Sequence, residues 1–445
     1  MKRKTRITVL FLLAAATAGA QKPWTFRQCL DTALQRNITV NQARMSNELN
    51  KVTLSQSKAA RIPSLSASAS EGLSIGKNID PTSNTYITKG NTTTNLGVSS
   101  SVNLFNGFQT ANTIRQNTIT VLAGESDIEK AKNDVTLNIT TGYLQVLFTQ
   151  EILQAARSQV EATAAQADRT EKLVNAGKSP ESDLLQVQSQ LATDNLSVVT
   201  AQNNLDLARV TLMQLMDIPV TDDFDVQVPE SAEPLQPAVL TRDQIYLKSL
   251  QVQPQVAAAS FRTNASEMAL KVSEGARWPR VTLGANLNSS YSSSRKTGSH
   301  NEQTYAFTDQ VWDNLGESFS LGISIPIYSN RQIRSNIEKA RINLTNSHLS
   351  EQNVKNTLRK TIEQTYTDLR AAGKKYEATK QQVTAVESAY RNAEKKFTVG
   401  VMNATDYLIQ KNSFTQAQSS LIQAKYDYIF KQKILDFYQG KAITF

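Results

Sequence analysis

The sequence contains a single cysteine, Cys29, and only two histidines, His300 and His348, in 445 residues. One thiol cannot form an internal disulfide, and no histidine stands near it to activate it, so we interpret Cys29 as a small buried side chain. The histidines lack the spacing of metal ligands. No nucleophile–base pattern is present either. We therefore predict no enzyme activity, no metal site and no cofactor.

Proline, glycine and aromatic residues are also scarce, with 11 prolines, 17 glycines and 7% aromatic residues. Hydrophobic residues make up 40% of the chain, which is lean for a thick globular core. Long helices with narrow apolar seams have this composition. One glycine lies in residues 176–179, which end like a phosphate-binding loop. The first glycine of that motif is replaced by Lys172, so we interpret Gly177 as a helix C-cap instead.

A strong excess of charge is missing as well. The formal net charge is +9, and four of these charges come from the first 20 residues, which leaves about +5 for the rest. Basic residues are dispersed along the chain, so no nucleic-acid partner is predicted.

Residues 1–20 resemble a secretory signal peptide. Four basic residues precede a short apolar stretch, and Ala18-Gly19-Ala20 supplies a small-residue cleavage pattern. The stretch is too short to span a bilayer, and no later segment is apolar enough for a transmembrane helix. An exported chain of this kind is either soluble or crosses the outer membrane as a β-barrel, whose strands are hidden in hydropathy averages.

An internal repeat runs through the chain. Residues 139–183 align with the second half at an offset of 223, and residues nearer the N-terminus align at 216. We predict two repeats, 21–217 and 241–445, joined by a linker at 218–240. The aligned pairs include Ile139 with Ile362, Tyr143 with Tyr366, Gly177 with Gly400, Val40 with Val256 and Pro63 with Pro279.

Each repeat has two stretches in which apolar and small polar residues alternate, at about 62–73 and 95–105 and at about 279–291 and 317–328. In the last of these, Phe319, Leu321 and Ile323 alternate with serine and glycine. Strands of this kind suit a barrel with lipid outside and water inside. A half-buried soluble sheet alternates identically, but the exported context favours the barrel. The polar segments 74–94 and 289–317 are predicted to be extracellular loops.

Helical hairpins are predicted at 108–216, with a tip at 175–183, and at 331–438, with a tip at 398–406. Their returning helices carry apolar residues every seven positions, which indicates a coiled-coil seam, although any antiparallel bundle has the same period. Asp194 is the exception at the second seam position. The seven-residue series are Leu184, Leu191, Val198, Leu205 and Leu212, and Tyr407, Phe414, Leu421, Tyr428 and Leu435.

The remaining predicted helices are about half as long as the long arm of each hairpin. Residues 110–175 give a helix of about 100 Å, and the helices at 24–60 and 181–216 together match it. The second repeat follows with 331–397, 405–438 and 241–276. We therefore expect long antiparallel helices together with four β-strands contributed by each chain.

Four strands cannot close a barrel, and open strand edges in lipid leave backbone groups unpaired. The barrel must therefore be shared between copies. A dimer gives eight strands and a filled interior, whereas a trimer gives twelve and room for a channel. Strand counting alone leaves both possibilities, and a pore favours three copies.

The order of several segments resembles the TolC-like outer-membrane efflux family over essentially the whole mature chain. Residues 24–34 resemble its opening helix, 60–65 the entry into its first strand, and 104–108 the exit into its long helix. The helix–turn–helix tip at 397–408 is the most specific segment, and 172–185 echoes it.

The resemblance implies a mainly α fold with a membrane β-barrel. It would be a homotrimer with a twelve-stranded barrel in the outer-membrane lipid of a Gram-negative bacterium and a periplasmic α-helical tunnel. It also implies docking to a periplasmic adaptor and an inner-membrane pump of RND or ABC type. The implied function is a passive duct for efflux. Type I protein secretion through the same duct is an alternative, and a poreless periplasmic coiled-coil scaffold or adhesin is another.

The family's gate residues map onto the tips. The Asp six residues after the tip glycine is Asp406 here, with Asp183 in the first repeat. A helix N-cap role is the competing interpretation, which we favour for Asp183 and leave open for Asp406. The family's arginine and second carboxylate are replaced by Met402 and Ile409, so its salt-bridge lock is not expected. The tip turns, with Gly177, Lys178, Gly400, Val401 and Met402, are candidates for adaptor docking.

Overall fold

The computed structural model describes residues 23–79, 84–229, 240–296 and 305–445. The predicted signal peptide, His300 and residues 230–239 of the predicted linker lie outside these ranges. The chain divides into two compact units, which are described separately below. Unit 1 comprises Met1–Ile38, Asn133–Thr241 and Glu363–Phe445, and unit 2 comprises Thr39–Lys132 and Arg242–Ile362. Each unit therefore draws on both sequence repeats, and the repeat boundaries remain a prediction.

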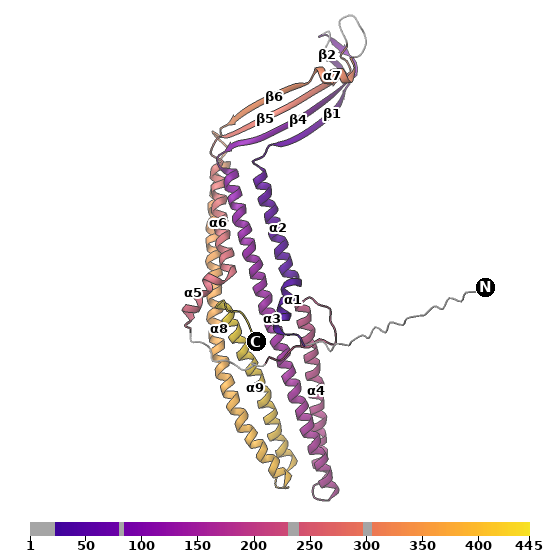
Figure 1. The fold of residues 1–445 in the computed structure, drawn as a ribbon, viewed down its shortest axis with the longest axis vertical. Coiled ribbons are helices and arrows are strands. Elements are labelled where there is room, and N and C mark those ends of the chain that lie inside the picture. Colours follow the sequence, from indigo (N-terminus) through magenta and orange to yellow (C-terminus); the bar gives the residue numbers. More distant parts are fainter. Residues whose placement is uncertain (1–22, 80–83, 230–239, 297–304) are drawn as a thin grey trace, which may run out of the picture. The chain divides into compact units, whose positions relative to one another are not determined.

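Unit 2 contains an antiparallel sheet in the order β1-β4-β5-β6 (Figure 1). A small hairpin of β2 (Lys77–Ile79) and β3 (Tyr86–Thr88) lies between β1 and β4 in the sequence. Among the described residues, β1 and β6 each pair on one side only. The four strands of the sheet are β1 (Ser64–Ser74), β4 (Asn91–Asn106), β5 (Arg280–Ser292) and β6 (Gly316–Ser324).

The two faces of this sheet differ in chemistry. Residues directly opposite in an antiparallel pair share a face, so the pairs Val98–Leu287 and Leu283–Leu321 lie on one face. The other face is polar, where the hydroxyls of Ser66 and Ser99 hydrogen-bond across the strands at 2.8 Å. The predicted alternation is confirmed, and the first face is called the apolar face below.

The helices of unit 2 approach closely through small side chains. α2 (Ile38–Ala59) and α6 (Pro254–Gly275) pack beside the first parts of α3 (Gln109–Asn175) and α8 (Gln332–Thr398) (Figure 1). Ser266 and Ser347 hydrogen-bond between α6 and α8 at 2.7 Å. The unit also holds α5 (Arg242–Val252) and α7 (Phe307–Asp313).

Unit 1 contains α1 (Phe26–Arg36), α4 (Glu181–Leu215), α9 (Ala404–Tyr438) and the second parts of α3 and α8. Its core includes an aromatic cluster in which the Phe26 ring lies 5.5 Å from Tyr143 and 4.8 Å from Phe445. Residues 218–229 are tied to the start of α1 by a parallel bridge between Trp24 and Val226.

Several predicted helices and strands end at other residues than expected. The helix predicted at 24–60 breaks at Asn37 into α1 and α2, and the one predicted at 241–276 breaks at Gln253 before Pro254. Proline at the first position of a helix lacks the amide that a continuing helix would need. The predicted strand 317–328 ends at Ser324, and the predicted loops contain the β2–β3 hairpin and α7.

No helix in the described part of the chain is both long and apolar enough to cross a bilayer.

Candidate functional site: the hairpin tips and their junction

Both hairpin tips turn on a glycine in the left-handed conformation. Gly177 has φ +68°, and the amides of Gly177 and Lys178 donate to Val174 and Leu173 carbonyls at 2.9 and 2.8 Å. Only glycine adopts this conformation without strain, and the two bonds satisfy carbonyls at the end of α3. The prediction that Gly177 is a C-cap is confirmed.

The second tip repeats this geometry at the end of α8. Gly400 has φ +76°, and the amides of Gly400 and Val401 donate to Phe397 and Lys396 carbonyls at 3.1 and 2.9 Å. The two turns therefore share one backbone design although their side chains differ. Lys178 makes the first tip polar and charged, whereas Val401 leaves an exposed apolar side chain on the second.

The N-cap interpretation of the two candidate gate residues is wrong. Pro180 occupies the N-cap of α4, and Asp183 accepts a hydrogen bond from the Ser179 hydroxyl at 2.8 Å. Asn403 is the N-cap of α9, and its side chain accepts from the Asp406 amide at 2.8 Å. Both aspartates are the third residue of their helices, where a carboxylate still favours the positive helix terminus.

Asp406 takes part in this cap through its backbone amide and its side chain. The Asn403 side-chain amide donates to its carboxylate at 3.0 Å, which holds the carboxylate on an exposed first turn. The N-terminal ends of α4 and α9 are in contact: the Thr405 hydroxyl in the first turn of α9 donates to the Gln186 side chain in the second turn of α4 at 3.2 Å. Asp183 and Asp406 therefore lie near the adjacent N-terminal ends of these two helices.

The second tip is built around its own small aromatic core. Phe397 and Tyr407 stack with ring centroids 4.8 Å apart, and Tyr390 stacks on Phe414 at 5.3 Å. Met402, at the position where the family carries arginine, packs against this core. Ile409, at the position of the second carboxylate, is exposed. Neither side chain can form the salt bridge or acidic ring of the best-known family members.

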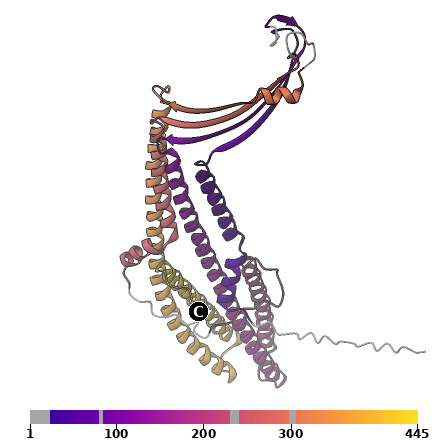
Figure 2. The same cartoon turned by 45° about the horizontal axis from the view of Figure 1, so that its top comes forward.

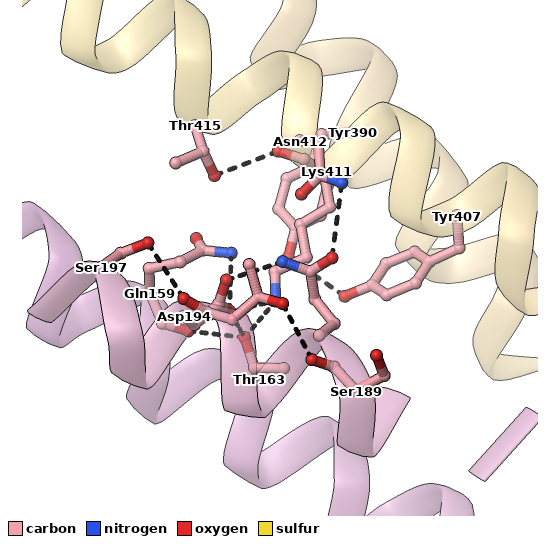
Figure 3. A network of polar contacts seen from close by, with 12 residues as sticks. Gln159, Thr163, Ser189, Asp194, Ser197, Tyr390, Tyr407, Lys411, Asn412 and Thr415 are labelled. Carbon is pink, nitrogen blue, oxygen red and sulfur yellow. Dashed lines mark hydrogen bonds and ion pairs between the residues drawn. The ribbon is translucent and has the colours of Figure 1, made fainter. Parts of the chain in front are cut away.

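Farther along the same helices, a buried charged pair joins the two hairpins (Figure 3). Lys411 on α9 is 1% exposed, and its Nζ lies 3.3 Å from the carboxylate of Asp194 on α4, which is 8% exposed. The Thr163 hydroxyl on α3 contacts both groups. The Gln190 amide donates to the second Asp194 oxygen at 2.7 Å. This set of four side chains is called the hairpin junction below.

The electrostatics of the hairpin junction are set mainly by burial. Burial lowers the pKa of Lys411 because it disfavours the ammonium, and the neighbouring Asp194 charge opposes this shift. The Tyr390 and Tyr407 hydroxyls lie 3.4 Å apart beside it (Figure 3), and burial raises the pKa of Tyr407. Removing one member of a buried pair leaves an uncompensated charge, which is strongly destabilising.

Of the four junction residues, only Asp194 is distinctive in the sequence, and no pairing was predicted for it. Asp194 stood out because it interrupts an otherwise apolar seam, but nothing in the spacing singled out Lys411. It follows Tyr407 by four residues, so a helix places both on one face.

The remaining residues considered for chemistry are Cys29 and His348. Cys29 is buried, and burial raises the pKa of its thiol to about 12, so it stays protonated at neutral pH. His348 lies in α8. Within the four described ranges, no group of three or more His, Cys, Asp and Glu side chains is placed to hold a metal ion.

The chain matches one family model and several known proteins. The family described as outer membrane efflux protein matches residues 29–217 and 245–440. The chain is 23% identical to outer membrane efflux protein BepC of Brucella suis over 429 residues, covering 96% of this chain and 88% of BepC. It is 24% identical to outer membrane protein TolC of Escherichia coli over 319 residues, 70% of this chain and 62% of TolC.

Its fold also matches that of the channel protein CusC, with a TM-score of 0.79 at 17% identity, covering 94% of this chain and 92% of CusC. The likeness supports the predicted fold class, which combines long antiparallel helices with a sheet of four strands per chain. The match over both halves of the chain also confirms the TolC-like resemblance and the place in the outer membrane. The chain belongs to the outer membrane efflux protein family.

Proposed function

We propose that this chain forms the passive outer-membrane duct of a tripartite export system. It receives substrates from an inner-membrane pump through a periplasmic adaptor and releases them outside the cell. The supporting observation is the four-stranded sheet with one apolar face, connected to long helical hairpins with paired tips. We expect no enzyme activity from such a duct.

The sheet itself supports a homotrimer. β1 and β6 carry backbone groups with no partner strand in the described chain, and such edges are costly in lipid. Edges of neighbouring copies can pair and close a barrel of about twelve strands, which leaves an open interior.

Asp406 and Asp183 are proposed to line the entrance of the duct. Three copies of each carboxylate near a constriction would attract cations and repel anions. Asp406 is the stronger candidate because Asn403 caps its helix and the carboxylate is exposed.

The tip turns are the proposed adaptor-docking surface. Gly177 and Lys178 form a polar turn, and Gly400, Val401 and Met402 form an apolar one. A partner that contacts both would need a charged and an apolar contact side by side. The pump that this adaptor serves, of RND or ABC type, would indicate whether the duct exports drugs or proteins.

Protein export is the second candidate function. A relative from Pseudomonas aeruginosa is named alkaline protease secretion protein AprF. The same duct geometry suits both cargoes, so the discriminating observation is which pump is retained when the tagged protein is purified after cross-linking in cells.

Single-channel recording of the purified mature protein in planar bilayers tests the proposal. We expect heat-modifiable trimers that insert and produce uniform conductance steps. A monodisperse monomer that stays soluble without detergent and shows no conductance would overturn the channel and favour a poreless coiled-coil scaffold.

A further inference from the structure

The short helix α7 lies beside the end of β5 (Figure 2). The Ser289 hydroxyl donates to the Val311 carbonyl at 2.6 Å, and the Tyr291 ring lies 5.0 Å from Phe307. Ser289 and Tyr291 follow Leu287 at every second position along β5, so they share its face. α7 therefore covers the end of the surface that carries Leu283 and Phe319 lower down.

Polar contacts hold α7 rigidly in this position. Gln310 is 0% exposed; its side chain donates to the Ser292 and Tyr305 carbonyls at 3.0 and 2.8 Å and accepts from the Ser292 amide at 3.0 Å. Asn314 donates to the Ser290 carbonyl at 2.6 Å. The bonds to Ser290 and Ser292 join α7 and its C-cap to the backbone of β5, so the helix packs as part of this end of the sheet.

The outward side of α7 carries an exposed indole. Trp312 is two residues from Gln310, a rotation of about 200° around the helix, and it therefore points away from the sheet. It is 75% exposed, and Phe307 and Leu315 beside it are also exposed. Contacts among the described residues of unit 2 do not account for this tryptophan.

Charged residues mark a boundary on the apolar face at the level of α7. Glu317 lies opposite Leu287, and Glu71 lies opposite Thr94, which in turn pairs with Tyr291. Below Glu317 the same face continues with Phe319, 80% exposed, and Leu321. A carboxylate is costly in hydrocarbon, so the polar boundary of the bilayer passes near Glu317 and leaves α7 just outside it.

We propose that α7 is an interfacial anchor whose Trp312 side chain inserts at the boundary between lipid headgroups and acyl chains of the outer leaflet. The inference rests on the proposed membrane function. The apolar face is the lipid-facing surface of that proposal, and α7 continues it. Tryptophan favours this boundary because its ring is apolar and its indole N–H can hydrogen-bond to headgroups. A seven-residue helix also leaves end groups that need polar partners, which headgroups and water supply.

The test uses the three native tryptophans, Trp24, Trp278 and Trp312. The variant W24F/W278F retains only Trp312 and is reconstituted in phosphatidylcholine vesicles with acyl chains brominated near the headgroup or near the chain end. We expect the shallow bromine to quench Trp312 fluorescence at least about twofold more than the deep bromine.

Two further variants serve as controls for this measurement. In a W24F/W278F/W312F background, Phe319→Trp places the only indole on the lipid-facing strand, about 7 Å along β6 from Glu317. We therefore expect a larger ratio of deep-bromine to shallow-bromine quenching than for Trp312. The variant W278F/W312F retains only Trp24, in unit 1, which neither lipid should quench. Comparable inserted trimers of all three variants establish that they fold.

The outcomes separate the two proposals. If the Phe319→Trp protein is quenched and the protein retaining Trp312 is not, the anchor is wrong, and aqueous iodide then distinguishes an indole in water from one covered by another copy. If neither is quenched by bromolipid, the apolar face does not meet lipid and the proposed membrane function fails as well.

Discussion

The ammonium of Lys411 depends on one carboxylate for its stability. Burial disfavours its charge, and Asp194 is its only acidic partner in the described contacts. Breaking such a pair typically costs about 3–5 kcal/mol, whereas an exposed pair contributes about 0–1 kcal/mol. Mutations in the hairpin junction are therefore expected to lower the free energy of unfolding far more than mutations in the surface ion pairs of the same helices.

We predict that Asp194→Asn destabilises the protein by about 3–5 kcal/mol, because it leaves the Lys411 ammonium buried without a counter-charge. Thermal unfolding followed by circular dichroism should show a lower Tm. Adding Lys411→Met should recover much of the loss. Asp168→Asn, in an exposed pair with Lys172, is the matched control and should change little. Equal effects of Asp194→Asn and Asp168→Asn would contradict a buried, coupled pair.

Because of the buried Cys29 thiol, we predict that the protein loses stability at high pH. Burial raises its pKa to about 12, while an unfolded thiol ionises near pH ~8.5. Between these values the unfolded chain has released a proton that the folded chain retains, so stability falls as pH rises, by up to about 1.4 kcal/mol per pH unit. Cys29→Ala should make the decline between about pH 9 and 11 shallower in pH-dependent Tm measurements. Exposed Tyr86→Phe is the control, and an unchanged slope in Cys29→Ala would refute this account.

At the scale of elements, the junctions between strands and helices in unit 2 depend on close backbone approach. Gly107, between β4 and α3, has φ +63°, and a Cβ there would lie 2.1 Å from the Gly275 carbonyl oxygen at the end of α6. No shift of a flexible side chain relieves a clash with backbone.

We predict that Gly107→Ala costs about 2–4 kcal/mol, from backbone strain and overpacking together, and sharply lowers the yield of folded trimer. Gly322→Ala is the matched control, since the nearest atom to its added Cβ is 4.0 Å away. Yield in outer-membrane fractions and heat-modifiable mobility on gels provide the measurement. Similar yields of both variants would show that the junction can relax around a methyl group.

At the scale of the whole molecule, the proposed gate can be tested by its charge. Asp406→Asn removes one exposed carboxylate from each copy in a trimer, and we expect the cation-over-anion permeability ratio to fall by about twofold or more. Reversal potentials in asymmetric salt measure this ratio. Asp31→Asn, an exposed acid on α1, is the control. An unchanged ratio in Asp406→Asn would remove Asp406 from the constriction.

The long elements were predictable because their signals are local. Heptad spacing in 184–212 and 407–435 and strict alternation in 318–324 each report one face of one element, and α4, α9 and β6 follow. The tip glycines were predictable for the same reason, since a left-handed turn selects its own residue. The family and its expected membrane location followed from the order of these segments.

The errors occurred where a local pattern has two outcomes. Asn37 continues a helical pattern, yet the chain turns there, and residues 218–229 dock against the start of α1. α7 was not predicted because it lies in a polar segment without an apolar helical pattern. Its buried residue is Gln310, which hydrogen-bonds to backbone atoms of β5. The N-cap role expected of Asp183 belongs to Pro180, because α4 begins at Glu181, before Asp183 is reached.

Periodicity, turn chemistry and the order of segments determine the helices, the strands and the family, because each depends on residues close together in the chain. The pairing of Lys411 with Asp194, 217 positions apart, could not be found in this way. The same holds for the position of α7 on the apolar face. Only packing of the folded chain decides these contacts, since burial and hydrogen-bond partners are properties of the assembled helices and sheet.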